Sequence, residues 1–191
     1  MRVAVTGTPG TGKTTAVESL SEEPNGVEVI HLNEHVEADH LRTGVDETRD
    51  SLVADLDALA DWLDSQETTE NGADDDSGDN SEVRTKTLVV ESHLAHLLDA
   101  DRVVVLRCRP EELTRRLAER GVDRRKANEN AESEALDVIL SEAVSRHGIE
   151  NVYEIDTTDR STADVRAAIA SVVTGERAPS AGTVSFLDFF E

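Results

Sequence analysis

Short runs of consecutive apolar residues alternate with amphipathic stretches along most of this chain. Five runs predict buried strands, at Arg2–Thr6 and at residues 27–32, 87–90, 102–106 and 152–155. The runs at 87–90 and 102–106 are apolar at successive positions instead of at every second one, which is typical of a parallel sheet covered on both faces. The pattern therefore predicts one three-layer α/β domain with a sheet of about five parallel strands and right-handed crossovers.

Apolar residues three and four positions apart predict the helices that cover this sheet. The predicted helices span residues 13–20, 110–120, 123–147 and 161–173, and residues 33–65 are polar and mostly helical. The helix at 110–120 has Pro110 in its first turn and ends before Gly121, which is a favourable start and stop. Strands and helices thus alternate, and together they delimit a domain at residues 1–174.

Two segments depart from this alternation. Residues 66–82 contain no large apolar side chain, and we predict a disordered acidic loop because such a segment cannot offset its own ordering entropy. Residues 175–191 are predicted to be a linker and an apolar tail, which ends in Phe186, Leu187, Phe189 and Phe190. This tail either packs on its own domain or docks on a partner, such as a sliding DNA clamp or a ribosomal protein.

The segment at residues 7–14 reads GTPGTGKT and matches G-x-x-x-x-G-K-[ST], between a predicted strand and a predicted helix. Its glycines allow the backbone to wrap a phosphate, and the N–H groups of residues 10–15 are expected to point at it. Lys13 offers a mobile charge to the β- and γ-phosphates of ATP, and the Thr14 hydroxyl offers a ligand to Mg²⁺. Thr15 extends the cradle or is an ordinary helix residue. The predicted nucleotide-binding residues here are Gly10, Gly12, Lys13, Thr14 and Thr15.

The charge of the chain is extreme for 191 residues. Its net charge is −22, with 41 acidic side chains against 19 basic ones. Such a surface repels nucleic acid, so we expect no direct DNA binding. Acidic residues spread along the whole chain, with only three lysines, resemble the proteins of halophilic, salt-accumulating archaea. An acidic face for a basic partner is the alternative interpretation.

The sequence also excludes membrane-spanning proteins and disulfide-bonded proteins as classes for this chain. No apolar run approaches the roughly 18 residues of a membrane span, and the first residues have the pattern of a strand instead of a secretory signal. The single cysteine, Cys108, excludes an internal disulfide and a cysteine-based zinc cluster. We therefore expect a cytoplasmic protein.

Two further stretches narrow the class of phosphate-loop protein. The chain has no Asn-Lys-x-Asp motif of a Ras-type GTPase and is too short for a large motor ATPase. Residues 88–93 read LVVESH, and residues 116–134 contain Arg120-Gly121, Lys126, Asn130 and Glu134. On these stretches and the loop, the chain resembles the adenylate kinase isoenzyme six family, nucleotide kinases associated with maturation of the small ribosomal subunit. The resemblance covers nearly everything except the acidic loop and the tail.

The resemblance implies a P-loop fold with an insertion for a nucleoside monophosphate (NMP) at residues 33–63 and a short lid at residues 120–130. It implies that an acid and His93 act in nucleotide hydrolysis, and that Arg120 stacks on the adenine or clamps the phosphates. Glu91 stands where eukaryotic members have Asp, at a strand end from which a carboxylate can reach Mg²⁺.

Simpler roles are open for each of these residues. Glu91 is alternatively an exposed acid, and His93 a packed histidine, with His93 and His96 together forming only a weak metal site. Arg120 belongs to a basic cluster at residues 115–126. The alternative interpretation of this cluster is a solvated helix face without a role in binding. Arg42 and Arg49 are candidates for the acceptor phosphate or for surface ion pairs.

Together these features predict an adenylate kinase, which converts ATP and AMP to two ADP, with ATPase activity. The predicted catalytic residues are Lys13, Glu91, His93 and Arg120, and the predicted Mg²⁺ ligands are Thr14 and Glu91. One alternative is a nucleotide-gated assembly ATPase that binds a small-subunit ribosomal protein. A small-molecule kinase of the shikimate type is another, although it shares only the loop.

Overall fold

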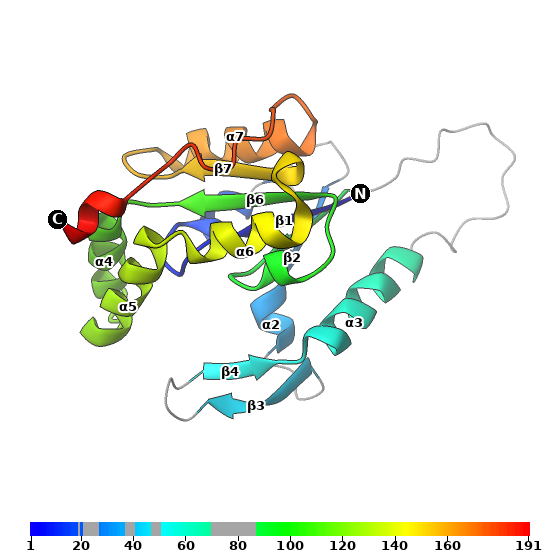
Figure 1. Cartoon of the computed structure of the whole chain (residues 1–191). Helices are drawn as coiled ribbons and strands as arrows, with labels where there is room; N and C mark the ends of the chain where they lie inside the picture. Colours follow the sequence, from blue (N-terminus) through cyan, green and yellow to red (C-terminus); the bar gives the residue numbers. More distant parts are fainter. Residues whose placement is uncertain (19, 21–26, 37–40, 47–50, 70–86) are drawn as a thin grey trace, which may run out of the picture. The chain divides into compact units, whose positions relative to one another are not determined.

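The structure is a computed structural model that describes residues 1–18, 20, 27–36, 41–46, 51–69 and 87–191 (Figure 1). The chain divides into two compact units. The larger consists of Met1–His31 and Lys86–Glu191, and the smaller of Leu32–Thr85. Each unit is described by itself.

The larger unit is built on the predicted parallel sheet. Its strands are β1 (Arg2–Thr6), β2 (Val27–His31), β5 (Thr87–Glu91), β6 (Arg102–Arg107) and β7 (Val152–Asp156), in the order β2-β5-β1-β6-β7. All four pairings are parallel, with β1 at the centre between β5 and β6. The prediction of an α/β domain with a sheet of about five parallel strands is therefore confirmed.

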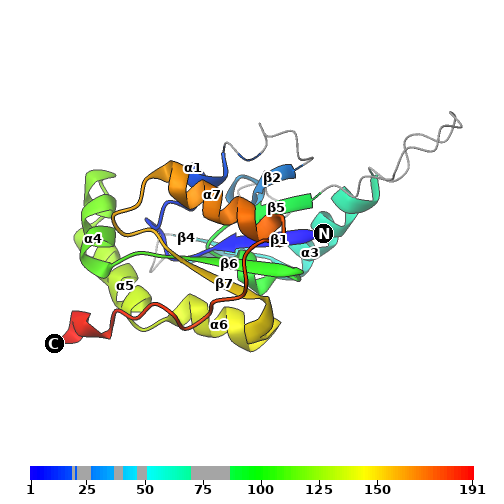
Figure 2. The same cartoon turned by 90° about the horizontal axis from the view of Figure 1, so that it is seen from above.

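Helices cover both faces of this sheet, which explains why its strands are apolar at successive positions. Helices α1 (Lys13–Val17) and α7 (Thr162–Val173) lie on one face, and α6 (Val138–His147) lies on the other (Figure 2). One core cluster joins α1 and α7 to alternate residues of the strands, including Val3 and Val5. Between them, Ala4 is also buried.

Two helices follow β6 and pack on each other, α4 (Pro110–Glu119) and α5 (Arg124–Ala135). The prediction of one helix over residues 123–147 is wrong, since that segment forms α5 and α6 with a break between them. Asp137 has a φ of 56° in the left-handed region, and its carboxylate pairs with Arg107. This tertiary ion pair interrupts a segment whose local pattern is helical.

The smaller unit contains α2 (Leu32–Val36), β3 (Arg42–Asp46), β4 (Ser51–Ala54) and α3 (Leu56–Thr69). The mostly helical prediction for residues 33–65 is wrong in its middle part, because β3 and β4 pair as an antiparallel hairpin. Thr43, Val45 and Val53 are β-branched residues that favour strands. In α3, the predicted spacing does hold, and Leu59 and Leu63 are fully buried.

Several predictions fall on parts of the chain outside the described residues. Helix α3 extends to Thr69, so residues 66–69 of the predicted acidic loop are helical, and residues 70–82 lie outside the description. Arg49 also lies outside it, whereas Arg42 is the first residue of β3. In the described part of the chain, no helix is both long and apolar enough to cross a bilayer.

The C-terminal segment packs on the larger unit. Figures 1 and 2 show it running along β7 toward α4 and α5. The Glu154 carboxylate of β7 accepts hydrogen bonds from the backbone N–H groups of Thr183 (2.7 Å) and Val184 (3.0 Å). Phe186 is only 3% exposed, and the Arg107 guanidinium lies 5.3 Å from the centre of its ring. Of the two alternatives for the tail, the structure has intramolecular packing up to Phe186, while Phe190 is 52% exposed.

We predict that removing residues 183–191 lowers the melting temperature by about 5 °C or more. The truncation exposes the site of Phe186 and leaves the buried Glu154 Oε2 without its hydrogen-bond donors, which costs about 2 kcal/mol or more. Thermal unfolding at molar KCl measures the effect, and the exposed Phe190→Ala change is the matched control, with little shift expected. An unchanged melting temperature in the truncated chain would contradict the packing and favour a peptide that docks elsewhere.

Candidate active site

The phosphate loop connects the carboxyl end of β1 to α1. Gly7 and Gly10 have φ values of 140° and 98°, in the region that favours glycine. A Cβ on Gly7 would lie 2.3 Å from the carbonyl oxygen of Leu106, and one on Gly10 would lie 3.1 Å from Leu117 Cγ. The loop is therefore held against both the end of β6 and the apolar face of α4.

Lys13 is buried beneath this loop, with a side chain that is only 7% exposed. Its Nζ donates hydrogen bonds to the carbonyl oxygens of Gly7 (2.8 Å) and Thr8 (3.1 Å). Burial lowers the pKa of Lys13 to about 8, against the opposing effect of the Glu91 and Glu134 carboxylates. A nearby anion would raise the pKa of this amine again, because an anion favours the charged form.

Glu91 lies at the carboxyl end of β5, directly opposite His31 at the end of β2. Its side chain is buried, and its Oε2 is 3.0 Å from His31 Nδ1. The carboxylate is thus oriented by a partner on the neighbouring strand, at the edge of the sheet where the phosphate loop begins.

His93 follows β5 and has part of its ring exposed. Loss of water around the rest of the ring, with the nearby charges of Lys13 and His96, lowers the pKa of His93 to about 4. The imidazole is therefore neutral at physiological pH and is able to accept a hydrogen bond.

His96 is a packing residue. Its Nε2 lies 2.9 Å from Glu142 and its Nδ1 lies 3.0 Å from the Thr6 hydroxyl. With the proton on Nε2, both nitrogens are satisfied, so His96 has no nitrogen left for the metal site considered with His93. The described residues contain no group of three or more His, Cys, Asp or Glu side chains that could hold a metal ion.

A pocket of about 190 Å³ lies beside the phosphate loop. Its lining combines loop residues with three arginines and the start of α7: Gly10, Thr11, Gly12, Thr15, Ala16, Arg116, Arg120, Thr157, Arg160, Thr162 and Val165. Arg120 caps the carboxyl end of α4, and its charge contributes to the lowered pKa of Lys13. The pocket therefore combines a backbone loop of glycines with concentrated positive charge, which suits a phosphorylated ligand.

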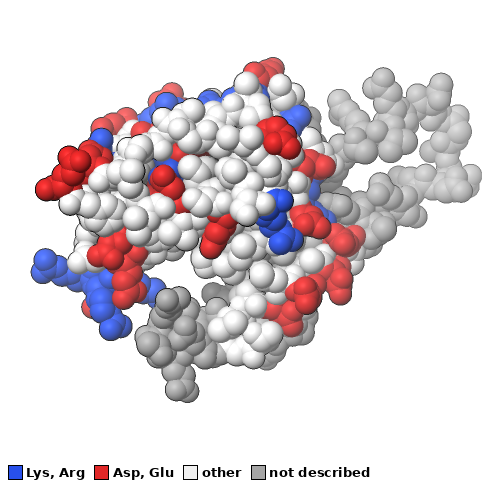
Figure 3. All heavy atoms as spheres, in the orientation of Figure 1, with Lys and Arg blue, Asp and Glu red and all other residues white. Residues whose placement is uncertain are grey.

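Basic side chains gather at the same end of the molecule. Figure 3 shows Lys and Arg side chains concentrated where α4 and α5 meet, on a surface where acidic ones are widely spread. The cluster comprises Arg115, Arg116, Arg120, Arg124, Arg125 and Lys126. Arg115 forms ion pairs with Glu112 and Glu119 of its own helix. Arg116 also pairs with Glu112 (2.8 Å), but it lines the pocket together with Arg120.

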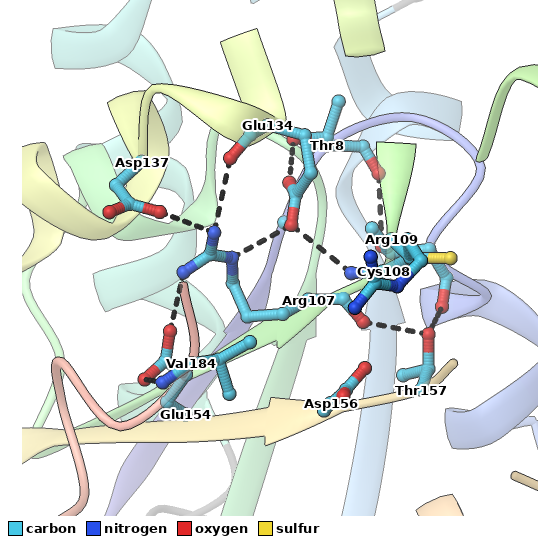
Figure 4. Close-up of polar contacts among 12 residues, drawn as sticks. Thr8, Arg107, Cys108, Arg109, Glu134, Asp137, Glu154, Asp156, Thr157 and Val184 are labelled. Carbon is cyan, nitrogen blue, oxygen red and sulfur yellow. Dashed lines mark hydrogen bonds and ion pairs between the residues drawn. The ribbon is translucent and has the colours of Figure 1, made fainter. Parts of the chain in front are cut away.

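Behind the loop lies a buried ion network centred on Arg107, the last residue of β6 (Figure 4). Its guanidinium pairs with Glu134 (2.7 Å), Asp137 (2.5 Å) and Glu154. Glu134 also accepts hydrogen bonds from the backbone N–H of Cys108 (3.1 Å) and from the Thr8 hydroxyl. Burial opposes the charge of Arg107, but the three carboxylates outweigh it and raise the pKa.

The structure brings most of the predicted site residues to one edge of the sheet. Gly10, Gly12, Thr15 and Arg120 line the pocket, and Lys13 lies within electrostatic range of Glu91, His93 and Arg120. Thr14 has an exposed side chain in the first turn of α1 and is not part of the pocket lining.

Sequence reasoning missed other residues at this edge. Thr157 follows β7, and its hydroxyl lies within hydrogen-bond distance of the carbonyl oxygens of Thr11 (3.0 Å) and Arg107 (2.8 Å). Arg160 and His31 carry no local motif. Arg107 and Glu154 could have been found in the sequence, because each is a charged residue within or at the end of an otherwise apolar strand.

Comparisons with known proteins agree with this geometry. Residues 3–137 match the family described as "AAA domain". The chain is 55% identical over 188 residues to a Natronomonas pharaonis protein named "Putative adenylate kinase", covering 98% of this chain and 99% of the other. Relatives of the same name include one from Halobacterium salinarum (51% identity; 99% of each chain) and one from Methanocaldococcus jannaschii (38%; 86% of this chain and 81% of the other).

Among solved structures, a deoxyadenosine kinase from M. mycoides with bound dATP is similar with a TM-score of 0.51 and 12% identity. The similarity covers 91% of this chain and all of that one, and at this identity it reports on the fold alone. That fold is the P-loop kinase fold, with its parallel sheet and phosphate loop. The chain therefore belongs to the AAA-domain family and, within it, to the group of archaeal proteins that share the adenylate kinase name.

Proposed function

We propose that this protein is an adenylate kinase that transfers the γ-phosphate of ATP to AMP. The observation that carries the proposal is the pocket in which the phosphate loop, Arg116, Arg120 and Arg160 converge beside Lys13. The names of the archaeal relatives support adenosine nucleotides as the substrates.

The donor ATP would place its phosphates in the loop and its nucleoside in the pocket beside it. Lys13 and Arg120 would neutralise the charge that spreads over the transferring phosphoryl group, and no covalent intermediate is required. Leu117 lies so near Gly10 that a Cβ at that position would be crowded, so α4 packs close to the loop. Arg120 at the end of this helix would therefore act from a position that is fixed before ATP binds.

Mg²⁺ fits the oxygen donors at this edge of the sheet. The Thr14 hydroxyl and the Glu91 carboxylate would hold it, with Glu91 oriented by His31. Mg²⁺ usually binds one or two carboxylates together with substrate phosphates instead of an all-protein cage. When bound, it would supply charge neutralisation on the donor phosphates.

The acceptor AMP is assigned to residues 33–63, which form part of the smaller unit. This assignment rests on the resemblance to the adenylate kinase isoenzyme six family. The same resemblance supports ATPase activity, cytoplasmic location and a small-subunit ribosomal protein as partner. Glu91 and neutral His93 are the features that favour hydrolysis, because they would orient a water molecule.

A coupled assay for ADP tests the proposal. The wild-type protein is supplied at molar KCl with ATP alone and with ATP plus AMP, CMP, GMP or UMP in turn. ADP formation that requires AMP is the expected result. Equal turnover without an acceptor would indicate an ATPase. Turnover with a monophosphate other than AMP would identify that nucleotide as the acceptor.

We predict that Arg120→Ala lowers kcat at least about tenfold and raises the KM for ATP much less. Its charge is expected to matter most when negative charge spreads in the transition state. Arg115→Ala is the matched control, because Arg115 lies on the same helix and is paired with Glu112 and Glu119. Equal kcat in the two variants would assign Arg120 to the surface.

We also predict that ATP binding weakens as pH rises above about 8. Lys13 has a pKa of about 8 in the protein and must carry its proton when phosphates bind. Below this pH the amine is already charged and affinity is constant, whereas above it the dissociation constant rises up to about tenfold per pH unit.

Calorimetry in two buffers with different ionisation heats measures this proton uptake directly. In Lys13→Arg, the side chain stays charged, so the pH dependence should disappear even if affinity falls. A wild-type affinity that is constant to pH 9.5 would contradict the assignment.

His93→Ala should reduce hydrolysis of ATP alone more than phosphorylation of AMP. Only hydrolysis needs an ordered water molecule, and a neutral imidazole is suited to accept its hydrogen bond. The ratio of the two rates, measured in one preparation, removes differences in folding. An equal loss of both would indicate that His93 serves the structure of the site.

A further inference from the structure

We propose that Glu134 is a positioning residue that fixes the geometry of the phosphate loop through the hydroxyl of Thr8. The inference rests on the proposed function, because it names a residue that would prepare the donor site for the phosphates. Glu134 lies in α5, 126 positions after Thr8, and one hydrogen bond between their side chains links it to the loop.

The Thr8 peptide organises the loop. Its carbonyl oxygen accepts hydrogen bonds from the backbone N–H of Thr11 (3.2 Å), from the Thr11 hydroxyl (2.9 Å) and from Lys13 Nζ (3.1 Å). The orientation of this one peptide therefore sets both the turn of the loop and the position of the lysine amine.

The side chain of Thr8 is anchored away from the loop. It is 2% exposed, and its hydroxyl donates a hydrogen bond to Glu134 Oε2. This is a charge-assisted bond between buried groups, which is stronger than one between neutral partners. Displacement of Thr8 would break it, so Glu134 restrains the position of this loop residue.

Glu134 is itself held rigidly. Its Oε1 accepts from Arg107 Nε (2.7 Å) and from the Cys108 N–H (3.1 Å), and its backbone carbonyl accepts from Arg107 (3.1 Å). The residue is 3% exposed. Figure 4 shows the carboxylate between Arg107 and Thr8, with one oxygen directed to each side. One oxygen thus fixes the carboxylate and the other fixes the loop.

Arg107 has two other carboxylates, Glu154 and Asp137, so neutralising its charge does not depend on Glu134 alone. What Glu134 adds is the contact to Thr8. Asp137 pairs with the same guanidinium, and among the contacts that the structure describes it has none with the loop. This difference makes Asp137→Asn a matched control, and Asn also tolerates the left-handed backbone found there.

The test compares Thr8→Val, Thr8→Ser, Glu134→Gln, the double variant Thr8→Val/Glu134→Gln, and Asp137→Asn. Two quantities are measured, the calorimetric Kd for ATP and the hydrogen exchange of the backbone amides in residues 8–14 without nucleotide. Thr8→Val keeps the side-chain shape and removes the hydroxyl, so we expect Kd and loop exchange to rise about tenfold. Thr8→Ser restores the hydroxyl and should stay within about twofold of wild type.

Glu134→Gln should raise Kd about threefold or more, and the double variant should bind ATP no more weakly than Thr8→Val. Asp137→Asn should lower the melting temperature without changing Kd or loop exchange. If Glu134→Gln does not fold, the comparison of Thr8→Val with Thr8→Ser decides the question.

Three results would overturn the inference: unchanged loop exchange in Thr8→Val, effects of Thr8→Val and Glu134→Gln on Kd that multiply in the double variant, or an Asp137→Asn effect as large as that of Glu134→Gln. A wild-type protein that binds no nucleotide would overturn the proposed function instead. Loop exchange would still decide the role of Glu134 in that case.

Discussion

The buried guanidinium of Arg107 is the group around which the larger unit is organised. A charge removed from water is costly unless it is paired and its partners are hydrogen-bonded in turn. Arg107 has three carboxylate partners, and these exceed its single charge by two. The surplus requires further donors. The Thr8 hydroxyl and the Cys108 N–H serve Glu134, and the N–H groups of Thr183 and Val184 serve Glu154. The phosphate loop and the C-terminal tail are thus attached to the sheet by the same requirement.

This arrangement places the site at the carboxyl ends of the strands, where open α/β sheets bind ligands. The ends of β1, β5, β6 and β7 supply, in turn, the phosphate loop, Glu91, Arg107 and Thr157. Contacts between these ends fix the loop from several sides. Gly7 is pressed against the Leu106 carbonyl, Thr157 reaches the Thr11 carbonyl, and Thr8 is bound to Glu134. The phosphate loop is therefore held in place by the ends of the strands as well as by its continuation into the short helix α1.

The sequence predicts the parts of this structure that depend on neighbouring residues. Apolar runs located all five parallel strands, and the GTPGTGKT segment located the phosphate loop, because both patterns are local. The break between α5 and α6 was not predicted, because Asp137 is held in its conformation by Arg107, 30 positions earlier. The contact of Arg107 with Glu154 spans 47 positions and depends on the register of β6 on β7. In the smaller unit, the polar residues around the β3–β4 hairpin masked a strand signal that rests on a few β-branched side chains.

Exposed and buried ion pairs of this protein are expected to respond differently to salt. Exposed pairs such as Arg115 with Glu112 are weakened by salt, since the screening length falls to roughly 3 Å at 1 M. The contacts that hold the loop lie among residues that are at most about 3% exposed, including Thr8, Arg107 and Glu134, and screening reaches buried pairs far less. The electrostatic interactions of the acidic surface, in a chain with a net charge of −22, can therefore change with the ionic environment. The geometry around the phosphate loop stays constant. The positive charge that lines the pocket, on Arg116, Arg120 and Arg160, lies beside the loop that would hold the phosphates. At high salt its effect on a nucleotide would therefore depend on contact distance and not on long-range attraction.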